Sequence, residues 1–128
     1  MNLLLDTCTF LWFTGQTAHL STKARRLCTD PDNTLFLSSV SAWEIEVKYR
    51  LGRLEMDDDP RIYIPEQRQS HHIFELPFEE EAALRYGDLP DIHQDPFDRM
   101  LICQAFAHDL ILLTPDEHIR AYPVQTEW

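Results

Sequence analysis

Four acidic residues of this 128-residue chain lie in segments whose pattern otherwise predicts buried structure. Asp6 and Asp116 follow apolar runs with strand character. Glu44 and Asp98 lie in apolar stripes with helical spacing. Burying an unpaired charge costs several kcal/mol, and no matching set of lysines or arginines falls in these segments. The simplest counter-charge is a divalent cation with oxygen ligands.

Each of the four acids also has an ordinary structural explanation. Asp6 and Asp116 can cap a following helix, and Asp98 can interact with a helix dipole from the first turn. Glu44 can close a capping box with Ser41, although this does not explain its place in an apolar stripe. One shared site accounts for all four acids together, so the sequence favours that interpretation.

Neighbouring residues allow further roles. Asp95, which precedes Pro96, is interpreted first as a helix N-cap and only second as a metal ligand. Lys48 lies one helical turn beyond Glu44 and can pair with it. Arg99 is equally compatible with a solvated charge and with a phosphate contact. The remaining bulky candidates are assigned to packing: Trp12, Trp43 and Phe97 to the core, and the six histidines to the surface or to packing.

The segments that must position these acids alternate between strand and helix patterns. Strands are expected at Leu3–Asp6, Leu35–Ser38, Ile73–Leu76, Leu110–Leu113 and, at an edge, Val124–Thr126. Helices are expected from Ser21 to Cys28, from Ser41 to about Leu51, over Glu79–Leu89, from Asp95 to about His108 and over Asp116–Ala121; a short helix in Pro60–Ser70 is disfavoured by Pro65. This order predicts an α/β fold with a parallel sheet, helices on both faces, and the acids at the carboxyl ends of the strands.

Composition narrows the classes of protein. The chain is expected to form one domain, residues 1–128, with 44% hydrophobic and 26% charged residues. No apolar run approaches the roughly 20 residues that span a bilayer, and the N-terminus lacks signal-peptide features, so a cytoplasmic protein is expected. The net charge of −11 argues against nucleic-acid binding unless several acids are metal ligands, and it allows a basic protein partner.

Several familiar sites are not indicated. Cys8, Cys28 and Cys103 are widely spaced, which predicts neither a disulfide framework nor a zinc ribbon. Cys28 and Cys103 fall on apolar helix faces and are expected to pack as small hydrophobic residues. The chain contains no glycine-rich nucleotide motif and no nucleophile elbow of a serine hydrolase.

Four segments together resemble the PIN-domain ribonucleases, in particular the VapC toxins of bacterial toxin–antitoxin systems. They are Leu4-Leu5-Asp6-Thr7, Ser41-Ala42-Trp43-Glu44-Ile45 with Lys48, His93 to Ile102 with its Asp-Pro-Phe-Asp-Arg core, and Leu113-Thr114-Pro115-Asp116. The resemblance implies a three-layer α/β/α fold with a central, mainly parallel sheet. It also implies Mg²⁺ or Mn²⁺ as cofactor, RNA as substrate, a homodimer, and an antitoxin partner with a basic segment.

The resemblance assigns roles to particular residues. Asp6, Glu44, Asp98 and Asp116 match the acidic quartet of the family, Asp95 matches an accessory acid, and Thr114 matches a hydroxyl residue near the site. Arg99 belongs to the same motif as Asp98. Cys8 is a departure, because relatives carry Asn or His there and a thiol cannot reproduce their hydrogen bonds.

The expected function is therefore a divalent-metal-dependent endoribonuclease, with Asp6, Glu44 and Asp98 as principal ligands and Asp116 as an outer ligand or water-orienting group. Two alternatives stay open. One is a catalytically silent PIN-like module that binds RNA or protein. The other is a metal-dependent DNA nuclease or phosphatase, which would use the same ligands.

Overall fold

A five-stranded parallel sheet organises residues 1–128, all of which are described in the computed structural model. The strands, in the spatial order β3-β2-β1-β4-β5, are β1 (Asn2–Leu5), β2 (Thr34–Ser38), β3 (Ile73–Leu76), β4 (Ile111–Leu113) and β5 (Thr126–Glu127). The α-helices are α1 (Thr7–Thr14), α2 (Thr22–Thr29), α3 (Ser39–Arg50), α4 (Pro60–Ser70), α5 (Glu80–Ala83), α6 (Pro96–His108) and α7 (Glu117–Arg120). The expected α/β fold with a parallel sheet is confirmed.

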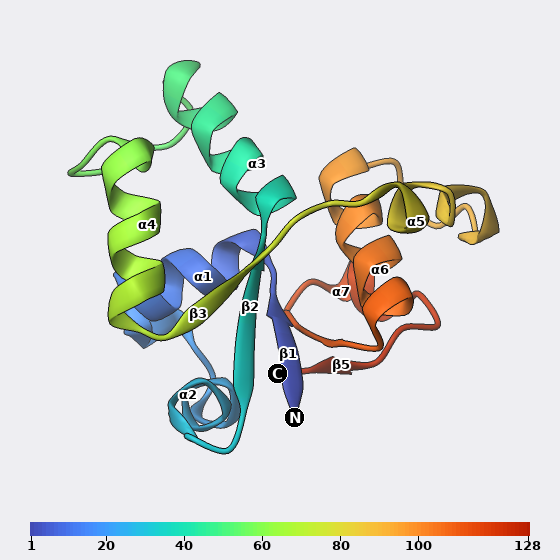
Figure 1. Cartoon of the computed structure of the whole chain (residues 1–128), viewed down its shortest axis with the longest axis horizontal. Coiled ribbons are helices and arrows are strands. Elements are labelled where there is room, and N and C mark those ends of the chain that lie inside the picture. The colour runs from blue at the N-terminus through green and yellow to red at the C-terminus, as the bar shows by residue number, and fades with distance from the viewer.

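Helices cover both faces of the sheet, as Figure 1 shows. Successive residues of β1 point to opposite faces: Leu3 and Leu5 pack into one core, with residues of α1, α2 and α4, whereas Leu4 packs into a second core with residues of α6 and α7. Helix α3 contributes to both cores, with Ile45 in the first and Val40 in the second. Burial of both faces explains why β1 and β4 read as continuous apolar runs.

Helix α3 begins earlier than the sequence pattern suggested. Its N-cap is Ser38, whose hydroxyl accepts from the backbone N–H of Val40 at 3.0 Å. Ser41 is therefore already inside the helix, and the alternative explanation of Glu44 as part of a capping box with Ser41 is wrong. Glu44 is the sixth residue of α3 and lies beyond its first turn, so a terminal dipole effect does not account for its position.

Three other elements differ from expectation. Helix α1 was not among the expected helices, because its polar and apolar residues show no helical periodicity; the capping alternative for Asp6 was the one indication of a helix there. Helix α4 forms despite Pro65, since burial of Ile64 in the first core offsets the missing backbone hydrogen bond. The helix expected over Glu79–Leu89 is instead the single turn α5 and a 3₁₀ turn at Tyr86–Asp88, because Gly87 disfavours helix and only Ala82 of α5 is buried.

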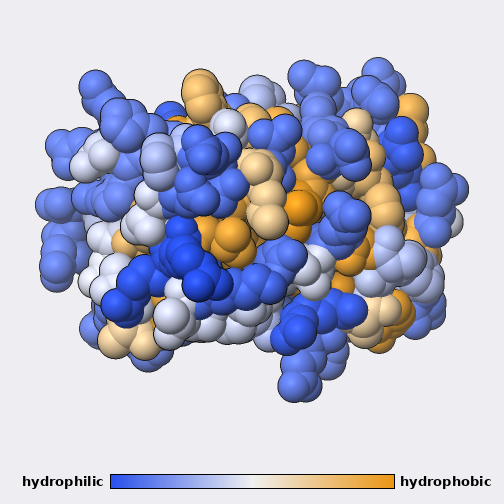
Figure 2. All heavy atoms as spheres, turned by 90° about the horizontal axis from the view of Figure 1, so that it is seen from below, coloured by the Kyte–Doolittle hydropathy of each residue, from blue (hydrophilic) through white to orange (hydrophobic).

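The surface is mixed in polarity. On the face drawn in Figure 2, hydrophilic residues cover most of the molecule and apolar residues gather in a central band. Cys28 and Cys103 are buried, as expected, with 7% and 1% of their surface exposed. No helix combines the length and the apolar character that crossing a bilayer requires.

Candidate active site

Asp6 and Asp116 lie at the carboxyl ends of adjacent strands. Leu5 of β1 pairs with Leu113 of β4, so the residues that follow leave the sheet at one edge. Asp6 caps α1 by accepting from the backbone N–H of Thr9 at 2.8 Å. Asp116 caps α7 by accepting from the backbone N–H of His118 at 2.8 Å. The capping explanation is thus correct for both acids, and it coexists with their common position.

The Asp6 carboxylate is almost completely enclosed. It is 4% exposed, and burial raises its pKa above the ordinary value, although hydrogen bonds from Thr114 and Thr9 oppose the rise. The Thr114 hydroxyl donates to Oδ2, and the Cys8 thiol lies 3.2 Å from Oδ1. Burial and the nearby Asp6 charge raise the pKa of Cys8, which therefore stays a neutral thiol donor at pH 7. Cys8 is thus one of the groups that hold Asp6.

Glu44 approaches from α3 and is 6% exposed. Its Oε1 accepts a hydrogen bond of 2.7 Å from the hydroxyl of Thr7, the first residue of α1. Its Oε2 pairs with the ammonium of Lys48, one turn further along α3, and this bond raises the pKa of Lys48. The expected pairing of Glu44 with Lys48 is confirmed, so this acid already has a protein counter-charge.

Asp98 is the third residue of α6 and faces a histidine. The N-cap of α6 is Asp95, which accepts from the backbone N–H of Asp98 at 3.1 Å, as the Asp-Pro pattern predicts. The Asp98 carboxylate lies 3.1 Å from Nε2 of His93, and Nδ1 of His93 lies 3.0 Å from the Tyr122 hydroxyl. A chain of polar contacts therefore fixes the orientation of Asp98.

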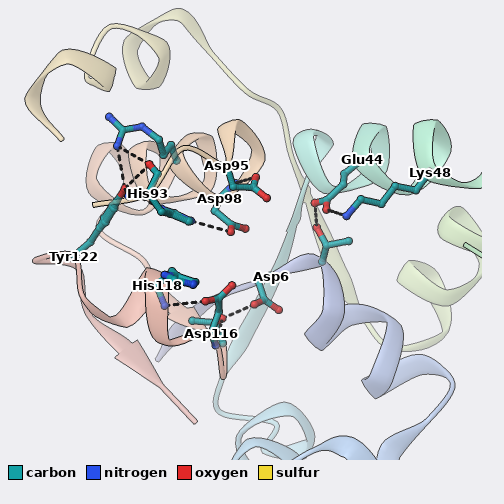
Figure 3. Close-up of polar contacts among 12 residues, drawn as sticks. Asp6, Glu44, Lys48, His93, Asp95, Asp98, Asp116, His118 and Tyr122 are labelled. Carbon is teal, nitrogen blue, oxygen red and sulfur yellow. Dashed lines mark hydrogen bonds and ion pairs between the residues drawn. The ribbon is translucent and has the colours of Figure 1, made fainter. Parts of the chain in front are cut away.

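Neighbouring acids act electrostatically on Asp98. Burial raises the pKa of Asp98 to about 6, and the charges of Asp95, Asp116 and Glu44 add to the rise, against the hydrogen bond from His93. In Figure 3 the carboxylates of Asp6, Asp98 and Asp116 point toward a common region, with Glu44 approaching from α3. The fold thus concentrates negative charge at one edge of the sheet.

The donor set suits a hard divalent cation. All four candidate ligands are carboxylates, and the raised pKa values of Asp6 and Asp98 reflect poor solvation or uncompensated negative charge. No three Asp, Glu, His or Cys side chains are arranged to hold an ion directly. Asp6 and Glu44 are occupied by hydrogen bonds and, for Glu44, by Lys48. Mg²⁺ keeps several waters and needs only one or two carboxylates, so the residues fit such an ion.

Two assignments from the sequence need correction. Arg99 is neither solvated nor available to a phosphate: it is 6% exposed, and its guanidinium donates to the Pro90 carbonyl and the Tyr122 hydroxyl at 3.0 and 2.9 Å. Trp43 is not a core residue, since 57% of it is exposed and its ring meets Phe97 edge-on at 5.5 Å. Both residues lie on helices whose weak amphipathic pattern does not separate inside from outside.

The role of His93 escaped the sequence argument, which assigned all histidines to the surface or to packing. His93 stacks on His118 with ring centres 5.3 Å apart and contacts both Tyr122 and Asp98. Its signal in the sequence is its place at the start of the segment His93 to Ile102, five residues before Asp98. The contact with Tyr122 joins positions 29 residues apart, which no local pattern reveals.

Comparison with known proteins agrees with this geometry. The family model described as "PIN domain" matches residues 3–125. The chain belongs to the PIN domain family. A segment of this PIN domain protein is 38% identical over 45 residues to "Ribonuclease VapC16" of Mycobacterium tuberculosis, and the match spans only 35% of this chain and 32% of that relative.

Solved structures share the PIN fold over nearly the whole chain. VapBC2 from Rickettsia felis, solved with a promoter DNA fragment, has a TM-score of 0.74 and 15% identity, covering 99% of this chain and 98% of that one. DNA-bound VapBC from Salmonella typhimurium has a TM-score of 0.67 and 18% identity, covering 99% and 97%. VapBC-5 from Mycobacterium tuberculosis has a TM-score of 0.60 and 16% identity, covering 98% of this chain and 95% of that one. The fold is thus maintained although few residues are identical.

Proposed function

We propose that this PIN domain protein is a divalent-metal-dependent endoribonuclease and the toxin of a toxin–antitoxin pair. The observation that carries the proposal is the arrangement of carboxylates at one edge of the sheet, where those of Asp6, Asp98 and Asp116 point toward a common region and Glu44 approaches from α3. Such a concentration of carboxylates at the ends of parallel strands suits a bound Mg²⁺ or Mn²⁺. The partial match to a protein named a ribonuclease supports RNA as the substrate.

Each residue has a proposed role. Asp6, Glu44 and Asp98 are the principal candidate ligands, and Asp116 is an outer ligand or orients the attacking water. When bound, the cation supplies an activated water and stabilises charge on the leaving oxygen. Thr114 and Thr9 hold Asp6 in place through hydrogen bonds, and His93 holds Asp98. Asp95 supports the first turn of α6 as its N-cap.

A cleavage assay tests the nuclease. The wild type should cut single-stranded RNA with Mn²⁺ and stop when EDTA is added, whereas Asp98→Asn should not cut. Circular dichroism should show the variant folded, because Asn can keep the contact to His93. Single-stranded DNA in a parallel reaction distinguishes a DNA nuclease. A folded wild type that binds RNA but never cuts it, with any divalent cation, would establish the silent-module alternative instead.

An apolar groove with acidic residues on its rim supports the antitoxin partner. The groove, of about 910 Å³, lies between α1, the end of α3 and the segment that follows. Its apolar lining includes Leu11, Trp12, Leu54, Met56 and Tyr63, and its acids are Glu55, Asp57 and Asp58. With a net charge of −11, the protein should attract a basic amphipathic segment. One of the structures that share its fold belongs to the VapBC family of toxin–antitoxin systems.

The toxin proposal predicts an effect on growth. Expression of the wild type alone should arrest bacterial growth, because the protein would cleave the RNA of its host, and co-expression of the antitoxin should restore growth. Asp98→Asn, expressed to the same level, should be harmless. Normal growth at full wild-type expression, in cells with no antitoxin, contradicts the toxin assignment. We also propose a homodimer, which light scattering of the purified protein tests directly.

A further inference from the structure

A small pocket beside Glu44 carries two cations in an otherwise acidic protein. The pocket, of about 230 Å³, is lined by Thr7, Cys8, Glu44, Lys48 and Arg53, among others. It does not include Asp6, Asp98 or Asp116, so it adjoins the candidate metal ligands at only one of them. A ligand in this pocket would therefore lie beside the candidate metal site, next to the phosphodiester that is cleaved there.

A local backbone motif brings the two cations together. Helix α3 ends in a Schellman motif, in which the N–H of Arg53 donates to the Lys48 carbonyl at 2.8 Å and that of Gly52 donates to Tyr49 at 3.1 Å. Gly52 adopts a φ of 73°, which a residue with a Cβ rarely accepts. The motif fixes the backbone of Arg53 against the last turn of α3. Both cationic side chains then line the same pocket.

Arg53 has no counter-charge within the protein. It is exposed, and its side chain makes neither an ion pair nor a hydrogen bond. Most other cations have partners: Lys23 pairs with Glu127, Arg50 with Glu46 and Asp59, Arg68 with Glu75, and Arg85 with Glu81. Three other arginines also make no ion pair and no side-chain hydrogen bond, but none of them lines this pocket; they are Arg26, Arg61 and Arg120. Arg53 is therefore a free cation beside the acidic cluster.

Lys48 also keeps capacity for a ligand. Its ammonium carries three donors, and Glu44 Oε2 is its one hydrogen-bond acceptor in the protein. Its side chain is 46% exposed, so the remaining donors reach solvent. An ammonium and a guanidinium that line one pocket can bind an anion with several oxygen atoms, such as a phosphodiester.

We propose that this pocket binds an RNA backbone phosphate that flanks the one being cleaved, with Lys48 and Arg53 as its ligands. The inference rests on the proposed nuclease function and adds the contact that an acidic protein needs to hold a polyanion. The contact is to phosphate, so it supplies affinity and position but no sequence preference. Thr7 adds a hydroxyl to the lining of the pocket, beside its bond to Glu44.

The phosphate site is tested by measuring how tightly Arg53→Gln binds labelled single-stranded RNA. Ca²⁺ replaces Mn²⁺ in this assay, and a gel verifies that the RNA stays intact. Arg26→Gln is the matched control, because Arg26 is also exposed, makes no ion pair and does not line the pocket. Arg53→Gln should bind several-fold more weakly at low salt. The slope of log K against log salt concentration should fall by about 0.7, the loss of one phosphate contact on a single strand. Arg26→Gln should change neither quantity.

Kinetics give a second and independent readout. Arg53→Gln should raise KM for RNA with kcat nearly unchanged, because the contact holds substrate and transition state equally. Lys48→Arg should bind RNA like the wild type, whereas Lys48→Gln should weaken binding, with a smaller salt slope. If Arg53→Gln binds RNA as tightly as Arg26→Gln does, the phosphate site is wrong. Cleavage of RNA by the wild type would still support the proposed nuclease function in that case. If that variant loses affinity only for a protein partner, the pocket binds a carboxylate instead. A wild type that neither binds nor cuts RNA overturns both proposals.

Discussion

The hydroxyl of Thr114 donates a hydrogen bond to Asp6 Oδ2 across a sequence separation of 108 residues. The hydroxyl oxygen of Thr114 in turn accepts from the backbone N–H of Asp116 at 3.1 Å, so the Thr114 side chain connects the two acids at the ends of β1 and β4. Thr114 is fully buried and Asp6 is 4% exposed, so water cannot replace this bond. The relationship couples the stability of the sheet edge to the orientation of a candidate ligand.

Replacing Thr114 by valine should lower the free energy of unfolding by about 1–3 kcal/mol, since it leaves a buried carboxylate oxygen without its donor. The pKa of Asp6 should rise further, because the hydrogen bond from Thr114 lowers it. Urea denaturation at neutral pH measures the loss. Thr114→Ser, which keeps the hydroxyl, should be closer to the wild type; equal losses in the two variants would show that the methyl group matters and not the bond.

Asp98 should make the metal-free protein less stable as the pH rises. Its pKa is about 6 in the folded protein against 3.8 ordinarily, so between these values the folded state binds more protons than the unfolded state. Stability from this group therefore falls from about pH 4 to pH 6 and stays lower above that. In EDTA, Asp98→Asn should lack this fall and should be at least as stable as the wild type at pH 7.5.

Thermal melts of the wild type and Asp98→Asn from pH 4 to pH 7.5 measure this difference in pH dependence, since the two proteins share all other titrating groups. Asp57→Asn is a suitable control, because it removes an exposed acid without hydrogen bonds in the protein. The prediction fails if Asp98→Asn and Asp57→Asn have the same pH dependence.

Divalent cations should stabilise the protein through Asp6. A cation that binds only the folded state adds about 2.7 kcal/mol at a hundredfold excess over Kd. Mn²⁺ should therefore raise Tm, whereas Na⁺ at matched ionic strength should not. Asp6→Asn should gain less from Mn²⁺, since Asn carries no charge. Equal Mn²⁺ shifts in Asp6→Asn and the wild type would contradict the shared metal site.

His93 should hold the pKa of Asp98 down. The contact between His93 Nε2 and Asp98 Oδ2 is 3.1 Å long, and this hydrogen bond lowers the pKa that burial raises. His93→Phe keeps a ring at the position but removes the donor, so the pKa of Asp98 should move above 6. Carboxyl ¹³C NMR of the metal-free protein measures it. His118→Phe serves as the control, because its ring stacks on His93 without bonding Asp98.

Most of the strands and helices, and the position of the acids at their ends, could be predicted from the sequence, because each depends on local pattern. Apolar runs mark the inner strands of a sheet that is buried on both faces, and an acid at the end of such a run must lie at the sheet edge. Asp95 before Pro96 predicts the start of α6, and the four-residue spacing of Glu44 and Lys48 predicts their ion pair. All of these features involve residues within one helical turn or one strand.

Only the tertiary structure decided which groups hold the acids and which side chains face solvent. Thr114 reaches Asp6, Thr7 reaches Glu44 and Tyr122 reaches His93 across sequence separations of 108, 37 and 29 residues. Such contacts depend on how the sheet brings its strand ends together. The exposure of Trp43 and the burial of Arg99 against Tyr86 and Tyr122 likewise depend on tertiary packing, since neither α3 nor α6 has a strongly amphipathic pattern. Local sequence defines the elements and their ends, whereas the environment of each charge is a property of the assembled fold.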